Sequence, residues 1–212
     1  MNFIEDPKEI EKRSFEIITE KLAGMQFNPQ NIDVIKRVIH TTADFDYADN
    51  LVFSDNAVSI AIETLKGGAR IVTDTQMAKA GINKKALEKL GCSAHCFIDS
   101  PEVVETAEAK GVTRAMAAVE RAAETLEPPV IFAVGNAPTA LIKLYELITS
   151  GYFSPALIIA VPVGFVNVVE SKELILGLKN PYIVARGQKG GSNVAAAICN
   201  ALLYSAEERT LA

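Results

Sequence analysis

Hydrophobic residues in the second half of the chain form three uninterrupted runs, each ending near glycine or proline and followed by a helical pattern. The runs are Val130–Val134, Ala156–Val161 and Tyr182–Ala185. Apolar, β-branched runs of this length are typical of strands buried on both faces of a parallel sheet. In an open parallel sheet, the turns after such strands line the carboxyl edge, where ligands bind. We therefore expect the functional site at that edge.

The first half of the chain shows mainly helical spacing of its apolar residues. Helices are predicted over residues 7–22, 31–39, 54–65 and 84–90, and one or two more over 101–126. Two short strands are predicted over residues 70–74 and 93–99. Strand and helix thus alternate five times after an all-helical N-terminal region. We expect an α/β fold, three-layer α/β/α with a five-stranded parallel, Rossmann-like sheet, in a single domain spanning residues 1–212.

Composition adds expectations about partners and location. The hydrophobic content of 49% and a mean hydropathy of +0.19 are high enough to suggest a homo-oligomer. A net charge of −5 argues against a nucleic-acid partner, which would require clustered basic residues. No apolar run approaches the roughly 18 residues of a membrane span. The acidic, polar N-terminus lacks a signal-peptide pattern, so we expect a cytoplasmic protein without a membrane partner.

The cysteines do not predict a metal centre. Cys92 and Cys96 flank His95, but the chain has only three cysteines and no second cluster that would complete four zinc ligands. Small buried thiols are the better interpretation, and no metal site is expected.

Two glycine-containing turns are candidate anion sites. Gly135-Asn136 begins a helix whose free N–H groups could hold an anion, although an ordinary strand-to-helix turn is about equally expected. The segment Arg186–Ser192 contains Lys189, Gly190, Gly191 and Ser192 but lacks the Walker and dinucleotide spacings. Two cations and unhindered N–H groups at a helix start suit carboxylates better than a nucleotide.

Proton chemistry points to His40, one of only two histidines. It ends the second predicted helix among Thr41, Thr42, Asp44 and Asp46. Histidine titrates near neutral pH, so His40 is a candidate proton donor or acceptor, the alternative being a capping residue satisfied by the helix dipole. His95, within a predicted strand, is expected to be structural.

Glu170-Ser171-Lys172 begins the helix after the fourth predicted strand. A solvated ion pair is the ordinary interpretation of such a triplet. The chain contains neither a Gly-x-Ser-x-Gly elbow nor a His-Glu-x-x-His helix, which argues against a serine hydrolase or a zinc protease.

Several of these stretches together resemble one family, the precorrin-8X methylmutases of cobalamin biosynthesis. The stretches are His40–Asp44, Gly135–Leu141, Pro162–Val166 with Glu170–Lys172, Gly187–Leu203, Arg13–Phe15 and Thr113-Arg114. The resemblance covers nearly the whole chain, and the combination is far more specific than any single glycine turn.

The resemblance implies a homodimer of three-layer α/β subunits that isomerises a corrin precursor. A methyl group moves from C-11 to C-12 of precorrin-8 or cobalt-precorrin-8, giving hydrogenobyrinate or cobyrinate. The shift is intramolecular, so no cofactor is implied. The histidine that matches His40 is the catalytic residue, which protonates the macrocycle as a general acid or hydrogen-bonds a ring nitrogen. A rearrangement of this kind requires mainly shape, orientation and one acid.

The implied substrate is a polycarboxylate macrocycle, with or without cobalt. We expect its carboxylates to be bound by basic side chains, hydroxyls and glycine-turn N–H groups. These candidates are Arg13, Ser14, Arg114, Gly135, Asn136, Lys172, Lys189, Gly190, Gly191 and Ser192. Arg114 and Ser14 follow from matching motifs, whereas Lys172 and Lys189 rest on their chemistry.

Two other classes of function remain as alternatives. A non-catalytic corrinoid-binding or carrier protein would hold the same ligand without turning it over. A nucleotide-dependent enzyme is disfavoured by the missing fingerprint. The sequence leaves open whether the substrate contains cobalt and whether a second subunit completes the pocket.

Overall fold

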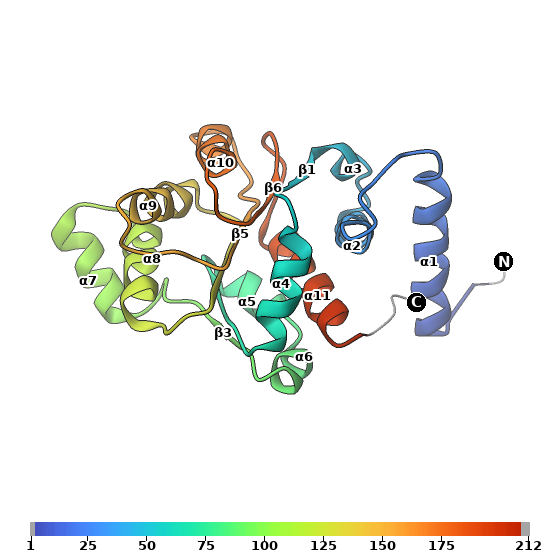
Figure 1. Ribbon diagram of the computed structural model, residues 1–212, viewed down its shortest axis with the longest axis horizontal. Helices are drawn as coiled ribbons and strands as arrows, with labels where there is room; N and C mark the ends of the chain where they lie inside the picture. The colour runs from blue at the N-terminus through green and yellow to red at the C-terminus, as the bar shows by residue number, and fades with distance from the viewer. Residues whose placement is uncertain (1–2, 209–212) are drawn as a thin grey trace.

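The computed structural model describes residues 3–208 and places one mixed sheet between two layers of helices (Figure 1). The strands lie in the order β1-β6-β5-β4-β2-β3. They comprise β1 (Leu51–Phe53), β2 (Arg70–Thr73), β3 (Ser93–His95), β4 (Val130–Val134), β5 (Leu157–Ala160) and β6 (Tyr182–Ala185). All five predicted strands are present and mutually parallel, although β3 ends at His95, short of the predicted residue 99.

The sixth strand, β1, was not predicted and runs antiparallel to β6. Leu51 pairs with Ala185 and Phe53 with Ile183 at the edge of the sheet. Three residues are too few to show the period of a strand, so the sequence pattern places this segment in the predicted N-terminal helical region. The predictions of an all-helical N-terminal region and of a purely five-stranded sheet were therefore wrong.

The strand order also differs from that of dinucleotide-binding folds. Counted along the chain, the parallel strands β2 to β6 lie in the order 2-1-3-4-5, which is the flavodoxin-type arrangement and not the order 3-2-1-4-5-6. The order reverses between β2 and β4, and in such sheets ligands bind outside the carboxyl ends at this switch point.

The helices follow the predicted ranges closely. Within residues 3–208 they are α1 (Pro7–Lys21), α2 (Ile32–Thr42), α3 (Tyr47–Asn50), α4 (Ala57–Lys66), α5 (Gln76–Gly81), α6 (Lys84–Lys89), α7 (Pro101–Lys110), α8 (Arg114–Thr125), α9 (Pro138–Thr149), α10 (Val168–Leu176) and α11 (Ser192–Ala206). Gly111, with φ of +64°, separates α7 from α8. The short helices α3 and α5 were not predicted, because α3 is a single turn and α5 has only one large apolar side chain, Met77, before it ends at Gly81.

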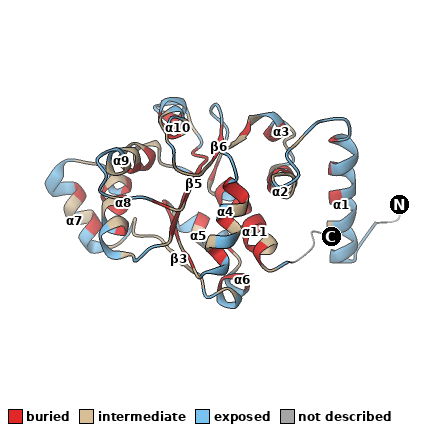
Figure 2. Cartoon of the chain, viewed as in Figure 1, coloured by how far each residue is buried: buried red, intermediate tan, exposed pale blue. Residues whose placement is uncertain are grey.

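Alternate residues of the central strands supply two cores (Figure 2). Ile131 and Ala133 pack with α4, α5 and α11 on one face of the sheet, whereas Val130 and Phe132 pack with α8, α9 and α10 on the other. Both faces of β4 are buried, as its apolar sequence predicts. The three α/β/α layers are thus present.

Two helices lie outside these layers. α2 packs on α11, and α1 packs on α2 at the far end of the molecule from α7 (Figure 1). The buried side chains of α1 are Phe15 and Ile18, followed by Leu22. The position of α1 therefore depends mainly on α2.

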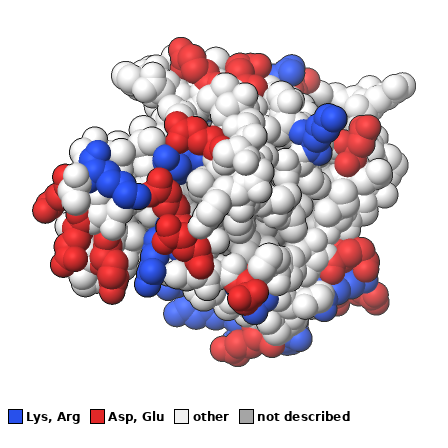
Figure 3. All heavy atoms as spheres, turned by 60° about the vertical axis from the view of Figure 1, so that its left-hand side comes forward, with Lys and Arg blue, Asp and Glu red and all other residues white. Residues whose placement is uncertain are grey.

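The surface shows mixed charge. On the face in Figure 3, Lys and Arg side chains lie among Asp and Glu side chains and form no extended basic patch. Within residues 3–208, no helix has the length and apolar character needed to cross a bilayer. The predicted single domain included residues 1, 2 and 209–212, which lie outside the described residues.

Candidate active site

The carboxyl edge of the sheet gathers four turns from distant parts of the chain. They follow β2, β4, β5 and β6 and comprise residues 74–75, 135–137, 161–167 and 186–191. Because β1 is antiparallel to β6, the segment that precedes β1 reaches the same edge. The Arg186 N–H donates to the Asn50 carbonyl at 2.8 Å. Only a short turn separates α3 from the end of α2, so His40 is brought towards this edge.

Asp74 joins the turns after β2 and β4 at the switch point. Its carboxylate, in a residue only 8% exposed, accepts from the N–H groups of Gly135 and Asn136 at 2.8 Å and of Ala137 at 2.6 Å. Burial raises the pKa of Asp74 and outweighs the opposing effect of these donors. The amides of Gly135 and Asn136, expected to bind a ligand, are thus already engaged by the protein.

The glycines in these turns allow the turns to pack closely. A Cβ at Gly135 would lie 2.8 Å from the Gly191 carbonyl oxygen, and one at Gly190 would overlap the Val161 carbonyl oxygen. The Gly191 N–H donates to that same Val161 carbonyl at 2.9 Å. Glycine is therefore required for close backbone approach at these positions.

Lys172 supports the turn after β6 from the interior of the protein. It is 1% exposed, and its Nζ donates to the carbonyls of Gly187 at 2.7 Å and Lys189 at 2.9 Å. Burial lowers the pKa of Lys172 to about 8. The interpretation of Lys172 as a solvated ion-pair partner was wrong, because the side chain is buried and no acidic partner appears among residues 3–208. Its contacts are to backbone carbonyls.

Lys189 connects the same turn to the segment beside His40. Its Nζ lies 2.6 Å from Oδ2 of both Asp44 and Asp46. The two carboxylates raise the pKa of Lys189, and Lys189 in turn lowers the pKa of Asp44. The ammonium is partly exposed, so the Lys189 cation stays at the surface of the edge while it fixes the turn after α2.

Ser192, the first residue of α11, is bound to the turn after β2. Its Oγ lies 2.7 Å from Oγ1 of Thr75, the capping residue of α5. The Gly164 N–H donates to the Gln188 carbonyl at 3.1 Å and links the turns after β5 and β6. Direct contacts therefore hold the turns of the edge together.

His40 lies in the last turn of α2, and its ring stacks on Phe15 of α1. The two ring centroids are 5.0 Å apart and the planes differ by 8°. Burial lowers the pKa of His40, the nearby Arg37 cation lowers it further, and Glu11 opposes them. Among the described residues no hydrogen bond to either ring nitrogen is present, so a neutral imidazole is available to a ligand. His95 lies in β3 with Nε2 2.8 Å from Ser93 Oγ.

The remaining candidates lie further apart. Arg13 is exposed on α1 and paired with Glu16 and Glu20, and the Ser14 hydroxyl donates to the Ile10 carbonyl within the same helix. Arg114 begins α8, next to Thr113, whose Oγ1 contacts Thr139 Oγ1 at the start of α9. Arg114 thus lies at the carboxyl edge, whereas Arg13 and Ser14 reach it only through the packing of α1 on α2.

A hollow of about 400 Å³ lies between α1 and α2 and does not coincide with this edge. Its lining is Lys12, Phe15, Glu16, Thr19, Glu20, Asp33 and Lys36. Acidic side chains outnumber basic ones in this lining, which makes the hollow a poor site for an anionic ligand.

Sequence reasoning missed Asp74 and gave no role to the exposed apolar side chains after β5, and it counted Arg186 only as one of two cations in its loop. Arg186 is exposed and, within residues 3–208, has no side-chain partner. Phe165 and Val166 are 84% and 77% exposed. The sequence signal that would have found the apolar segment is Phe165 in the turn between Gly164 and Asn167. Turns lie at the surface, and large exposed apolar side chains mark binding surfaces.

Comparisons with known proteins support one family. The model of the precorrin-8X methylmutase family matches residues 9–205. The chain is 46% identical to a cobalt-precorrin-8 methylmutase of Salmonella typhimurium, covering 98% of this chain and all of the relative. It is 36% identical to a precorrin-8X methylmutase of Pseudomonas aeruginosa over the same shares. The solved precorrin-8x methyl mutase of Thermus thermophilus superposes with a TM-score of 0.87 at 39% identity, covering 94% of this chain and 98% of that one.

Replacing Asp74 by Asn should destabilise the fold and loosen the turn after β4. An amide retains one acceptor oxygen but faces the backbone donors with an NH₂ group, and we expect a loss of about 2–4 kcal/mol in the free energy of unfolding. Urea denaturation measures it, with Asp99→Asn at an exposed loop position as the control. Equal stability of the two variants would show that Asp74 does not hold the turn.

Lys172→Met should change how stability depends on pH. The pKa of Lys172 is about 8 when folded and near 10.4 in an unfolded chain, so between these values the unfolded state binds more protons. The contribution of Lys172 to the free energy of unfolding therefore rises with pH between the two pKa values and is constant below about pH 8. The free energy of unfolding of the wild type should gain about 1.4 kcal/mol per pH unit over that of the variant between pH 8 and 10.

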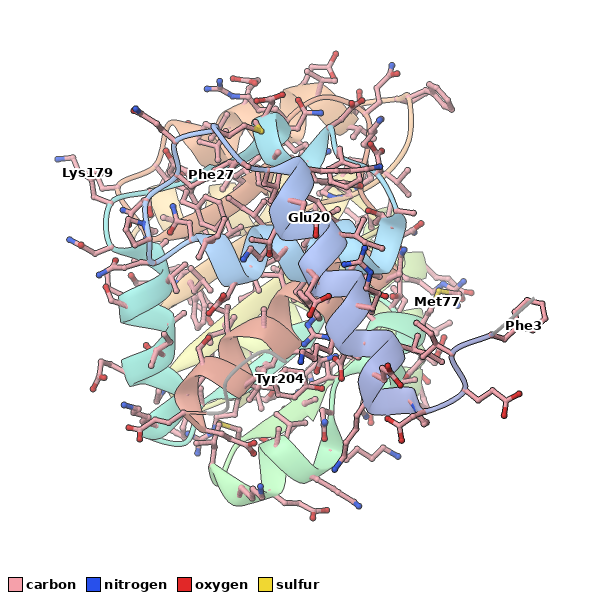
Figure 4. The ribbon with its side chains drawn as sticks, turned by 90° about the vertical axis from the view of Figure 1, so that its right-hand side faces the viewer. Phe3, Glu20, Phe27, Met77, Lys179 and Tyr204 are labelled. Atoms are coloured by element: carbon pink, nitrogen blue, oxygen red, sulfur yellow. The ribbon has the colours of Figure 1, made fainter. Side chains whose placement is uncertain are left out.

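The matched control is Lys179→Met, at an exposed lysine that points away from the molecule (Figure 4). The difference in the free energy of unfolding between Lys179→Met and the wild type should stay constant over the same pH range. A constant difference for Lys172→Met as well would mean that the buried lysine keeps an ordinary pKa.

Proposed function

Since the chain belongs to the precorrin-8X methylmutase family, we propose that it is an isomerase of corrin-ring biosynthesis that moves a methyl group from C-11 to C-12 of precorrin-8. The full-length similarity to enzymes of this name carries the proposal. The migration is intramolecular, so the protein has only to bind the macrocycle, orient it and manage one proton. A site built from firmly held turns suits this task.

We further propose that the substrate contains cobalt. The Salmonella typhimurium relative, named a cobalt-precorrin-8 methylmutase, is 46% identical, whereas the Pseudomonas aeruginosa relative named for the metal-free substrate is 36% identical. Cobalt is held by the macrocycle and belongs to the substrate. The product is then cobyrinate, and hydrogenobyrinate is the product of the metal-free alternative.

His40 is proposed as the general acid. Its lowered pKa leaves the free protein with a neutral imidazole near pH 7. A bound polycarboxylate brings negative charge to the ring and favours the imidazolium form. The substrate thereby promotes protonation of His40, and the proton is available when the macrocycle is in place. The same N–H can stabilise developing charge on a ring nitrogen.

The carboxylates are proposed to meet the cations of the carboxyl edge. Arg114 and Arg186 are exposed and have no partner among the described residues, and planar guanidinium groups bind carboxylates with two hydrogen bonds. Lys189 adds charge beside them while it holds Asp44 and Asp46. Lys172 contributes through the backbone of the turn, because its ammonium is buried. Arg13, Ser14, Gly190, Gly191 and Ser192 stay predictions.

The exposed apolar segment after β5 suits a flat face of the macrocycle. Val163, Phe165 and Val166 are exposed beside Gly164, which is tied to the turn after β6. A corrin ring is apolar on its faces and anionic at its rim, so apolar side chains next to arginines match both parts. A homodimer is proposed as well, consistent with the high hydrophobic content, and a cytoplasmic location stays a prediction.

Multiple turnover distinguishes the isomerase from a corrinoid carrier. With substrate in 50-fold excess, absorption spectra recorded anaerobically should show complete conversion to the rearranged corrin, with a higher kcat/KM for the cobalt form. A spectral change that stops at one equivalent per subunit would indicate binding alone. Equal or higher kcat/KM for the metal-free substrate would overturn the proposal about cobalt.

His40→Asn should reduce kcat by about 10²–10⁴-fold while substrate still binds, because an amide keeps a hydrogen-bond donor but cannot transfer the proton. Steady-state rates and equilibrium titration of the product measure the two effects. His95→Asn, at the other histidine, is the control and should retain kcat. Loss of binding without loss of kcat in His40→Asn would assign the residue to recognition.

A further inference from the structure

Arg37 is a nearly buried cation one helical turn before His40. Its side chain is 13% exposed, and NH1 lies 3.0 Å from Glu11 Oε1 on α1. Its Cζ lies 4.7 Å from the centroid of Phe15 and 5.4 Å from that of Tyr204. An arginine among two rings and one carboxylate is held in a defined orientation, because stacking and ion pairing both restrict the planar group.

The same two turns of α1 contact both Arg37 and His40. Glu11 pairs with Arg37, and Phe15, four residues later, contacts Arg37 and stacks on His40. Residues four apart lie on one face of a helix, as do Arg37 and His40, which are three apart. These four side chains therefore form one part of the interface of α1 with α2, beside the apolar contacts of Ile18 and Leu22. In Figure 4, α1 passes in front of α2 beside the labelled Glu20, and the labelled Tyr204 of α11 lies further towards the N-terminal end of α1.

The charges around His40 come from few groups. Besides burial, Arg37 on α2 opposes the imidazolium, and Glu11 on α1 favours it. From α11, Tyr204 faces Arg37 with an uncharged ring. Asp44 and Asp46, in the turn towards α3, are bound by Lys189. Glu11 and Arg37 are thus the charged side chains whose substitution should change the pKa of His40.

We propose that Arg37 is a positioning residue for His40: its guanidinium, held by Glu11, Phe15 and Tyr204, fixes α1 against α2 and so fixes the imidazole ring on Phe15. Burial is the main cause of the lowered pKa of His40, and this cation lowers it further. Arg37 acts through His40 and need not touch the substrate. The inference rests on the proposed role of His40, but its structural part is measurable without substrate.

The chain contains only two histidines, so NMR of histidine-labelled protein resolves His40, with His95 as an internal reference. In Arg37→Met the pKa of His40 should rise, because the opposing cation is lost and Glu11 is left unpaired. In Glu11→Gln it should fall. In Arg37→Lys, which keeps the charge, it should stay near that of the wild type. The pKa of His95 should be unchanged in all three variants.

Kinetics separate positioning from charge. Arg37→Lys loses the planar stacking group, so we expect kcat to fall on the order of tenfold with KM within about twofold, because a displaced catalytic group costs rate more than binding. A His40 pKa that is unchanged in both Arg37→Met and Glu11→Gln, or a wild-type kcat in Arg37→Lys, would overturn the inference. If Arg37→Met does not fold, Arg37→Lys and Glu11→Gln decide the question.

The two proposals fail in different ways. If His40→Asn keeps full kcat while the His40 pKa still responds to Arg37 and Glu11, the proposed acid is wrong and the contact network is right. If His40→Asn is inactive and the pKa of His40 does not respond to Arg37 and Glu11, the proposed acid is right and the inference about Arg37 is wrong.

Discussion

The antiparallel pairing of β1 with β6 is the constraint on which the arrangement of the site depends. Together with the packing of α2 on α11, this pairing fixes α2 and α3 relative to the carboxyl ends of the parallel strands. Leu51 opposite Ala185, and the hydrogen bond from Arg186 to Asn50, bring the segment after His40 to the turn after β6. Lys189 then binds Asp44 and Asp46 across the same junction. A three-residue strand thus connects the segment that follows α2, the helix that carries His40, to the carboxyl edge of the sheet.

Buried charges maintain this edge in different ways. Asp74 accepts three backbone N–H groups at the switch point, and Lys172 donates to two backbone carbonyls beneath the turn after β6. Each charge is expensive to bury and is compensated by oriented peptide dipoles. The turns are thereby preorganised, so that substrate binding is not required to order them. Arg114 and Arg186, in contrast, are exposed, as their proposed role in binding carboxylates requires.

The sequence predicted the parts of the fold that have a clear period. The strands β4, β5 and β6 were found because burial on both faces leaves a continuous apolar run, and the long helices were found from the helical spacing of their apolar residues. β1 and α3 were missed because three or four residues show no period, and α5 was missed because Gln76–Gly81 carries few large apolar side chains and ends in glycine. The burial of Lys172 and the bonding of the Gly135-Asn136 amides to Asp74 were not predicted for another reason. Both depend on residues far apart in sequence, Lys172 on Gly187 and Gly135 on Asp74, and no local pattern encodes such pairs. His40 is a candidate from its chemistry and the resemblance alone, whereas its contacts with Phe15 and its proximity to Arg37 follow from helix packing.

The most direct test of the account is to follow the migrating methyl group itself. Substrate carrying ¹³C in the C-11 methyl group would be mixed anaerobically with a catalytic amount of the protein and observed by NMR. The account predicts that the labelled signal moves to the chemical shift of a C-12 methyl group over many turnovers, with no exchange of label between labelled and unlabelled molecules. A signal that stays at C-11, or that moves in only one equivalent per subunit, would contradict it.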